Sequence, residues 1–312
     1  MHPAFSVIFF TVSSGTGYGL LFLLGLLAGL DKLPESPVLG LVGMALGLGL
    51  VVAGLLSSLF HLGHPERAWR AFSQWKTSWL SREGVVSVAS FGPSLGLAYL
   101  WVFHGPDHPL LALSGWATAA LAVVTVYCTA MIYRSLRPVH QWANGWTVPA
   151  YLAMGLAGGG LLLVVLYALF GLALATLPLC AAAALMLAWA VKTGYWHFVD
   201  TSKSASTAET ATGLGHIGKV RQLEGPHTED NYLLKEMGFR VAQKHSQKLR
   251  RYAHVLGFLI PVLLLVAAAQ STDVNVALVA VCAVIFFMIG AITERWLFFA
   301  EARHTVTLYY GG

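Results

Sequence analysis

The sequence predicts an all-α integral membrane protein, a bundle of eight transmembrane helices with both chain termini on the same side. Two observations lead to this prediction. Of the 312 residues, 57% are hydrophobic and only 11% are charged, whereas about 25% of the residues in a typical soluble domain are charged. The charges are also unevenly distributed, because long runs of the chain contain no Asp, Glu, Lys or Arg.

Each predicted helix is an apolar run of about 20 residues or more, the length that crosses the hydrocarbon core of a bilayer. The run 138–191 has no Asp, Glu, Lys or Arg and is too long for one helix, so we divide it near Gly171. A membrane barrel would require short alternating strands, and the sequence does not alternate in this way. The predicted spans are 3–30, 36–60, 85–103, 108–133, 149–170, 173–196, 252–271 and 274–293.

The distribution of Lys and Arg predicts the orientation. An even number of spans places both termini on one side, together with every second loop. Outside the loop 200–251, nine Lys and Arg residues lie on that side, including Lys192 at the end of the sixth span, whereas Lys32 is the single one opposite. By the positive-inside rule the terminal side is cytoplasmic. We therefore expect a multi-pass protein of the bacterial inner membrane with both termini cytoplasmic.

Three segments follow from this layout: helices one to six with an interfacial loop 61–84 in residues 1–199, a basic cytoplasmic loop with an amphipathic helix in residues 200–251, and the last two helices with a tail in residues 252–312. The loop 200–251 contains nine basic and six acidic residues. Leu234, Met237 and Val241 recur in it at helical spacing. This helix lies on anionic lipid, forms a docking surface for a cytoplasmic partner, or does both. No motif supports nucleic-acid binding.

The stretch HLGHPERAW, residues 61–69, places polar chemistry at the end of the second span. His61 lies in the last helical turn, where the helix C-terminus favours the imidazolium form, so it can donate or shuttle protons. The alternative is an interfacial histidine bonded to its own helix. Pro65 can open a helical turn, because the first helical position needs no amide donor. We therefore expect a short interfacial helix over residues 65–75.

Acidic residues flank two other spans. Glu83 precedes the third span, where Ser81 could cap the helix and Glu83 could favour its N-terminus. Glu294 and Glu301 are seven residues apart and share one face of the last helix. Because ionisable groups near an apolar span usually face the bundle interior, Glu294 and Arg295 are candidates for the same site as HLGHPERAW. An interfacial ion pair is the alternative.

The residues offer little for metal binding. The three cysteines, Cys128, Cys180 and Cys282, are isolated in apolar runs, and an iron–sulfur cluster needs about four thiolates. His197 and His254, at facing ends of the sixth and seventh helices, are the pair that could ligate a haem b. We expect neither a metal site nor haem b in this chain.

Over most of its length the chain resembles the membrane-anchor subunits of the DMSO reductase type, including the anchor of cytoplasm-facing sulfite dehydrogenase. The resemblance rests on the eight spans, on HLGHPERAW, on LSREG before the third span and on ERWLFFAEARHTV at the end of the eighth. It implies a quinone site, for ubiquinone or menaquinone, near the face that binds a ferredoxin-like iron–sulfur subunit. That subunit in turn carries a molybdopterin catalytic subunit, so the molybdenum cofactor and the clusters belong to the partners.

The resemblance also implies roles for individual residues. His61 would lie at the quinone, with Arg67 and Glu83 beside it. His64 stands where the DMSO reductase anchors have a small residue. A histidine, an arginine and a glutamate at one membrane face can bond quinone oxygens and move protons. The residues expected to support the site are Gly63, His64 and Pro65.

The predicted orientation selects the direction of electron flow. Partners on the cytoplasmic face favour an anchor that passes electrons from sulfite oxidation to the quinone pool. The alternatives are the anchor of a DMSO or polysulfide-type reductase running from quinol to substrate, a haem b-containing quinone-reactive subunit, and a passive anchor. A transporter would place charged or broken helices at the membrane midplane, whereas the charges here gather at one face.

Overall fold

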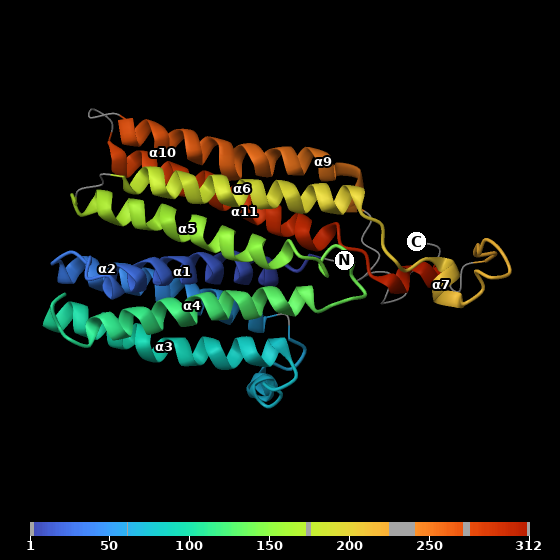
Figure 1. Cartoon of the computed structure of the whole chain (residues 1–312), viewed down its shortest axis with the longest axis horizontal. Coiled ribbons are helices and arrows are strands. Elements are labelled where there is room, and N and C mark those ends of the chain that lie inside the picture. The colour runs from blue at the N-terminus through green and yellow to red at the C-terminus, as the bar shows by residue number, and fades with distance from the viewer. Residues whose placement is uncertain (1–2, 61, 173–175, 225–240, 271–274, 311–312) are drawn as a thin grey trace.

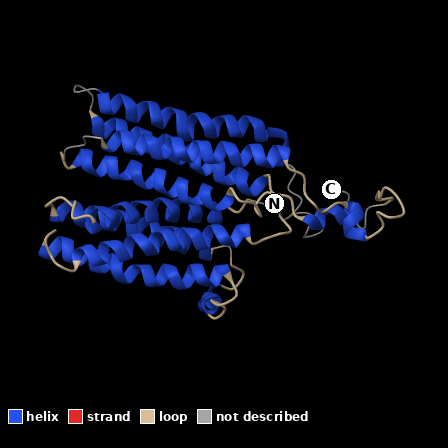
Figure 2. Cartoon of the chain, in the orientation of Figure 1, coloured by secondary structure: helices blue, strands red, loops and turns tan. Residues whose placement is uncertain are grey.

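The computed structural model describes residues 3–60, 62–172, 176–224, 241–270 and 275–310. Eight helices in this part of the chain are long and apolar enough to cross a membrane, which confirms the predicted fold class. Almost all of the described chain is helical (Figure 2), and its β pairing is confined to an isolated bridge between Val139 and His304.

The membrane-length helices are α1 (Phe5–Gly29), α2 (Pro37–Leu59), α3 (Trp79–His104), α4 (Leu111–Arg134), α5 (Thr147–Leu169), α6 (Leu177–Thr201), a continuous segment formed by α9 (Val241–His254), the π-helical turn η2 (Val255–Leu259) and α10 (Ile260–Gln270), and α11 (Val276–Ala300). The short elements are η1 (Pro65–Phe72), α7 (Ala208–Thr212) and η3 (Thr305–Tyr310).

Helix α1 begins and α11 ends at the same end of the bundle, which we call the terminal end (Figure 1). The short elements η1, α7 and η3 also lie at this end. The bundle has two halves, α1 to α4 and α5 to α11, and α1 joins them because it packs against α2, α4, α5 and α11. Gly19 of α1 faces Gly155 and Gly159 of α5 so closely that a Cβ on it would overlap their backbones.

Turn and cap residues explain where several helices begin and end. Gly171 has a φ of +65° and lies between α5 and α6, which confirms the predicted division of the long run. Helix α3 begins at Trp79, six residues before the predicted span, because the Ser78 side chain accepts the backbone N–H of Ser81. The expected capping roles of Ser81 and Glu83 are therefore wrong, since both lie within the helix and are buried.

The seventh span begins earlier than predicted, at His245, and contains the π-helical turn before Pro261. A proline has no N–H to donate to the previous turn, and a π-turn is one way in which a helix accommodates such a disruption. Gly257 lies in this turn and packs directly against Gly290 of α11. The part of the predicted amphipathic helix in residues 225–240 lies outside the described residues.

Candidate functional site

A cavity of about 960 Å³ lies at the terminal end of the bundle, between α1, α2, η1, α3 and the ends of α4 and α11. Its walls are mainly apolar, with an aromatic side formed by Tyr133, Trp142 and Phe299. The indole N–H of Trp142 is not available to a ligand in the cavity, because it donates to the backbone carbonyl of Phe298 at 2.8 Å. The cavity is large enough for an aromatic ring with substituents.

Glu83 is the buried carboxyl group of this cavity. It lies one turn inside α3 and is 5% exposed. Its carboxylate accepts a hydrogen bond from the Thr129 hydroxyl of α4, and within the described chain no lysine or arginine forms an ion pair with it. Burying a carboxylate without a cation is costly. Glu83 is therefore poised to take up a proton or to bond a polar group in the cavity.

The helix η1 brings the polar residues of HLGHPERAW to the same cavity. Pro65 is its first residue, which confirms the predicted helical turn, although the helix ends at Phe72. His64 and Arg67 both line the cavity and share one partner: His64 Nδ1 lies 3.0 Å and Arg67 Nε 3.7 Å from Glu66 Oε1. Glu66 therefore orients both side chains, which are otherwise exposed.

The structure brings together four of the residues that the sequence pointed to, since Gly63, His64, Arg67 and Glu83 line one cavity. His61 lies outside the described residues. Its neighbour in the sequence, Leu62, lines the cavity.

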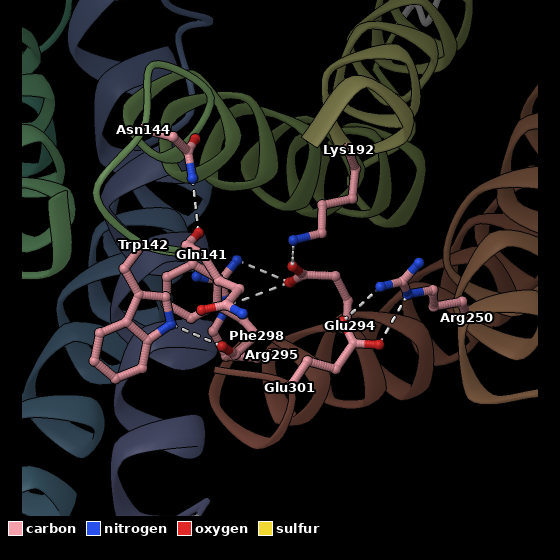
Figure 3. Close-up of polar contacts among 9 residues, drawn as sticks. All are labelled: Gln141, Trp142, Asn144, Lys192, Arg250, Glu294, Arg295, Phe298 and Glu301. Carbon is pink, nitrogen blue, oxygen red and sulfur yellow. Dashed lines mark hydrogen bonds and ion pairs between the residues drawn. The ribbon is translucent and has the colours of Figure 1, made fainter. Parts of the chain in front are cut away.

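Glu294 does not belong to this cavity. It lies inside α11, is 1% exposed, and forms ion pairs with Lys192 and with Arg295, whose Nη2 is 2.8 Å from Glu294 Oε2 (Figure 3). The guanidinium of Arg295 lies 4.2 Å from the ring centroid of Tyr151, which in turn stacks on Tyr133. The expected single site is therefore two sites, the cavity and an ion cluster, with two tyrosines between them.

Lys192 is the member of this cluster that the sequence did not reveal. It was expected at the end of the sixth span, but α6 continues to Thr201, so Lys192 lies within the bundle and is fully buried. Its ammonium lies 3.7 Å from the ring centroid of Tyr195. A buried carboxylate requires a partner, so the position of Glu294 directly after an apolar run was the signal for a cation on a neighbouring helix.

A second group of ion pairs, formed by Asp200, Arg250 and Glu301, lies at the terminal end beside this cluster. Arg250 donates to Glu301 at 2.9 Å (Figure 3). It also donates to Asp200 at 2.7 Å. Burial raises the pKa of Glu301, and the bonds from Arg250 partly offset this. These residues line a polar cleft of about 520 Å³. The basic end of the predicted amphipathic helix is therefore partly inserted in the bundle, because Arg250 is 8% exposed.

His197 and His254, the pair considered for haem b, have different surroundings in the structure. The indole N–H of Trp189 donates to His254 Nδ1 at 2.7 Å, and the ring of Trp196 packs 4.7 Å from the same imidazole. His197 is exposed on α6. Across the described residues, no group of three or more His, Cys, Asp or Glu side chains could hold a metal ion.

Fold and site together define a multi-pass helical membrane protein with an apolar cavity and a buried carboxyl group at one end. The family model for the DMSO reductase anchor subunit (DmsC) matches residues 1–311, so the chain belongs to this family and is a membrane anchor subunit of an oxidoreductase complex. This confirms the resemblance drawn from the sequence.

Two relatives refine the family assignment. The protein is 36% identical to a sulfite dehydrogenase subunit of Allochromatium vinosum, over 99% of both sequences. It is 29% identical to a subunit of the anaerobic dimethyl sulfoxide reductase of Escherichia coli, over 46% of this sequence and 50% of that one. No solved structure matches the protein.

Proposed function

We propose that the cavity binds the headgroup of a quinone and that this anchor passes electrons from sulfite oxidation to the quinone pool. One observation carries the proposal: a carboxyl group without an ion-pair partner, Glu83, lies buried in the wall of an apolar cavity of about 960 Å³. A quinone headgroup is a flat ring with two carbonyl oxygens, so it needs apolar walls and a few polar groups.

The residues divide the work as follows. Tyr133, Trp142 and Phe299 provide an aromatic wall for the ring. Reduction to quinol adds two electrons and two protons, and Glu83 supplies protons to a quinone oxygen. Arg67 stabilises negative charge on the headgroup as electrons arrive. His61 is assigned to the headgroup by the family resemblance.

The electrons come from partner subunits. The family and its relatives support a ferredoxin-like iron–sulfur subunit that carries clusters, joined to a molybdopterin catalytic subunit. The cavity is at the terminal end, and so are α7 and η3, so we place the docking face there. The charge bias makes this face cytoplasmic in a bacterial inner membrane.

The relatives support one direction of electron flow. The sulfite dehydrogenase subunit matches nearly the entire chain, whereas the dimethyl sulfoxide reductase subunit matches about half of it. We therefore favour sulfite oxidation with quinone reduction over the reverse flow from quinol. In the purified complex, sulfite should reduce added quinone. Reduction of dimethyl sulfoxide by added quinol, without sulfite-dependent quinone reduction, would reverse the assignment.

Substitution of Glu83 tests the quinone site. In the assembled complex, Glu83→Gln should lower the rate of quinone reduction by about 10²-fold, because the carboxyl proton donor is lost. Sulfite oxidation with a soluble dye as electron acceptor should be unchanged, since it does not use the cavity. The control is Glu35→Gln, an exposed glutamate at the opposite end of the bundle. A wild-type rate and KM for quinone in Glu83→Gln would contradict the site.

A further inference from the structure

Buried hydroxyl groups continue from Glu83 along the interface between α3 and α4. On α3 they follow Glu83 at intervals of four, three and four residues, which keeps them on one helix face. None of them is more than 7% exposed. We call this set the hydroxyl row: Ser87, Ser90 and Ser94 of α3, Thr118, Thr125 and Thr129 of α4, and Tyr18 of α1.

Two contacts define how α3 and α4 pair. At the terminal end, Glu83 is bonded to Thr129. Farther along, Gly96 faces Ser114, since a Cβ on Gly96 would lie 3.8 Å from Ser114 Oγ. The helices are antiparallel, so both contacts belong to nearly the same register. The residues between them therefore face one another in pairs.

This register places hydroxyl groups opposite one another. By this register Ser87 lies at the level of Thr125, and Ser94 lies at the level of Thr118. Between these pairs Ser90 faces an alanine, and Tyr18 of α1 fills the position, with its hydroxyl 3.4 Å from Ser90 Oγ. The row therefore has a hydroxyl group at each of these levels from Glu83 to Thr118.

Ordinary helix packing explains only part of the row. Ser90 and Thr125 donate to backbone carbonyls of their own helices, each at 2.7 Å. In contrast, the hydroxyl oxygens of Ser87, Ser94 and Thr118 are buried without a hydrogen-bond partner among the described residues. A buried hydroxyl without a partner costs free energy, and ordered water is the usual partner for such groups.

The row crosses most of the membrane. From Thr129 to Thr118 it follows about 16 Å of α4, at 1.5 Å per residue. Half-buried Ser114, one turn beyond Thr118, extends the path to about 22 Å, and the hydrocarbon core is about 30 Å thick. At one end Glu83 and Ser87 line the cavity. At the other end, Ser114 is half-buried, less than one turn from the start of α4.

We propose that the hydroxyl row, with water bound at its unpartnered hydroxyls, carries protons between Glu83 and the membrane face opposite the partner subunits. This inference rests on the proposed quinone chemistry. A quinone that receives two electrons takes up two protons by way of Glu83, and the row replaces each of them from the opposite face. Because electrons and protons then enter from opposite faces, each turnover moves charge across the membrane and responds to the membrane potential.

The test uses the complete complex in sealed vesicles that contain quinone, with a pH dye inside. Sulfite added outside reaches only complexes whose catalytic subunits face outward, and its oxidation with water releases protons outside. The interior should become alkaline by about two protons for each quinone reduced, and an interior-negative potential should develop. Thr118→Val, which keeps the side-chain shape, should remove at least about nine-tenths of both signals.

Two further variants separate proton transfer from packing. Thr118→Ser keeps the hydroxyl and should keep both signals. Thr193→Val makes the same substitution at an exposed threonine of α6 that is bonded to its own helix, and it should behave as the wild type. Quinone reduction with no change of interior pH or potential would overturn the proposal, as would a Thr118→Val complex with wild-type signals.

A second electron source distinguishes failure of the row from failure of the proposed function. If sulfite reduces no quinone, a membrane-impermeant reductant of the iron–sulfur subunit replaces it. If this reductant reduces quinone, sulfite is the wrong substrate. The interior pH and the potential then still test the hydroxyl row. No quinone reduction with either donor overturns the quinone site, and the row as its proton path with it.

Discussion

At the residue scale, the cluster of Lys192, Glu294 and Arg295 carries two positive charges and one negative charge in the interior of the bundle. Ion pairs in such a setting stabilise the fold only as complete groups, because each isolated charge would be left in an apolar medium. Glu294 is the single anion, so both cations depend on it. Removal of Glu294 should therefore be more harmful than removal of either cation.

We expect Glu294→Gln to lower the free energy of unfolding by about 3–5 kcal/mol, because two buried cations lose their anion. Lys192→Met should cost less, since Glu294 and Arg295 still form a neutral pair. The double variant Lys192→Met/Glu294→Gln should recover part of the loss caused by Glu294→Gln alone. Thermal unfolding of the purified complex in detergent measures all three. Additive losses in the double variant would contradict coupling between the two residues.

The candidate site was partly predictable at this scale. Gly63, His64 and Arg67 are close in the sequence and follow the end of a span, so their common position is a local property. Glu83 is separated from these residues in the sequence by a short interfacial segment. Glu294 was correctly grouped with Arg295, but it was placed in the same site as HLGHPERAW. Its other partner, Lys192, lies on a helix that is distant in the sequence.

At the element scale, close contact between α1 and α5 holds the two halves of the bundle together. Gly19 provides this contact, because its missing side chain allows the Gly155 carbonyl to approach. Gly15, one turn earlier on α1, has open space where a Cβ would be. The two glycines therefore form a matched pair for substitution.

Gly19→Ala should destabilise the protein by about 1–3 kcal/mol, because the added methyl group overlaps the α5 backbone and forces the helices apart. Gly15→Ala should change stability by less than about 0.5 kcal/mol. The yield of folded complex and its thermal unfolding midpoint report both effects. Equal effects of the two variants would show that the α1–α5 contact is not tight at Gly19.

The helices themselves were predictable, because membrane thickness dictates their length and composition. Their boundaries were less so. The first five residues of α3 include Arg82 and Glu83, so hydropathy placed the start of the helix too late. The cap by Ser78 and the burial of Glu83 show that the helix begins before these charges. Hydropathy detects contact with lipid, whereas Ser81 and Glu83 in this segment are buried against protein.

At the scale of the whole molecule, the terminal end gathers the cavity, the polar cleft and the short elements of the loops. Among the described residues, the opposite end carries short connections. This asymmetry agrees with the uneven distribution of Lys and Arg, and together they predict that the terminal end faces the cytoplasm.

A reporter protein that works only in the cytoplasm should be active when it is fused after Gly312. A reporter that works only in the periplasm should be inactive at the same position. A second fusion within the α1–α2 connection, at Lys32, should show the opposite pattern, because that connection lies at the other end of the bundle. Activity of a periplasm-dependent reporter at the C-terminus would place the partners outside. It would then favour the quinol-oxidising alternative.

The sequence by itself determined the number of spans, their order and the polar segment that meets the cavity, because these depend on local length, hydropathy and charge. The tertiary structure alone decided which buried groups meet. Both the pairing of Lys192 with Glu294 and the alignment of hydroxyls between α3 and α4 depend on the rotation and depth of packed helices. Packing between helices decides these two quantities, and no local pattern in a single helix contains them.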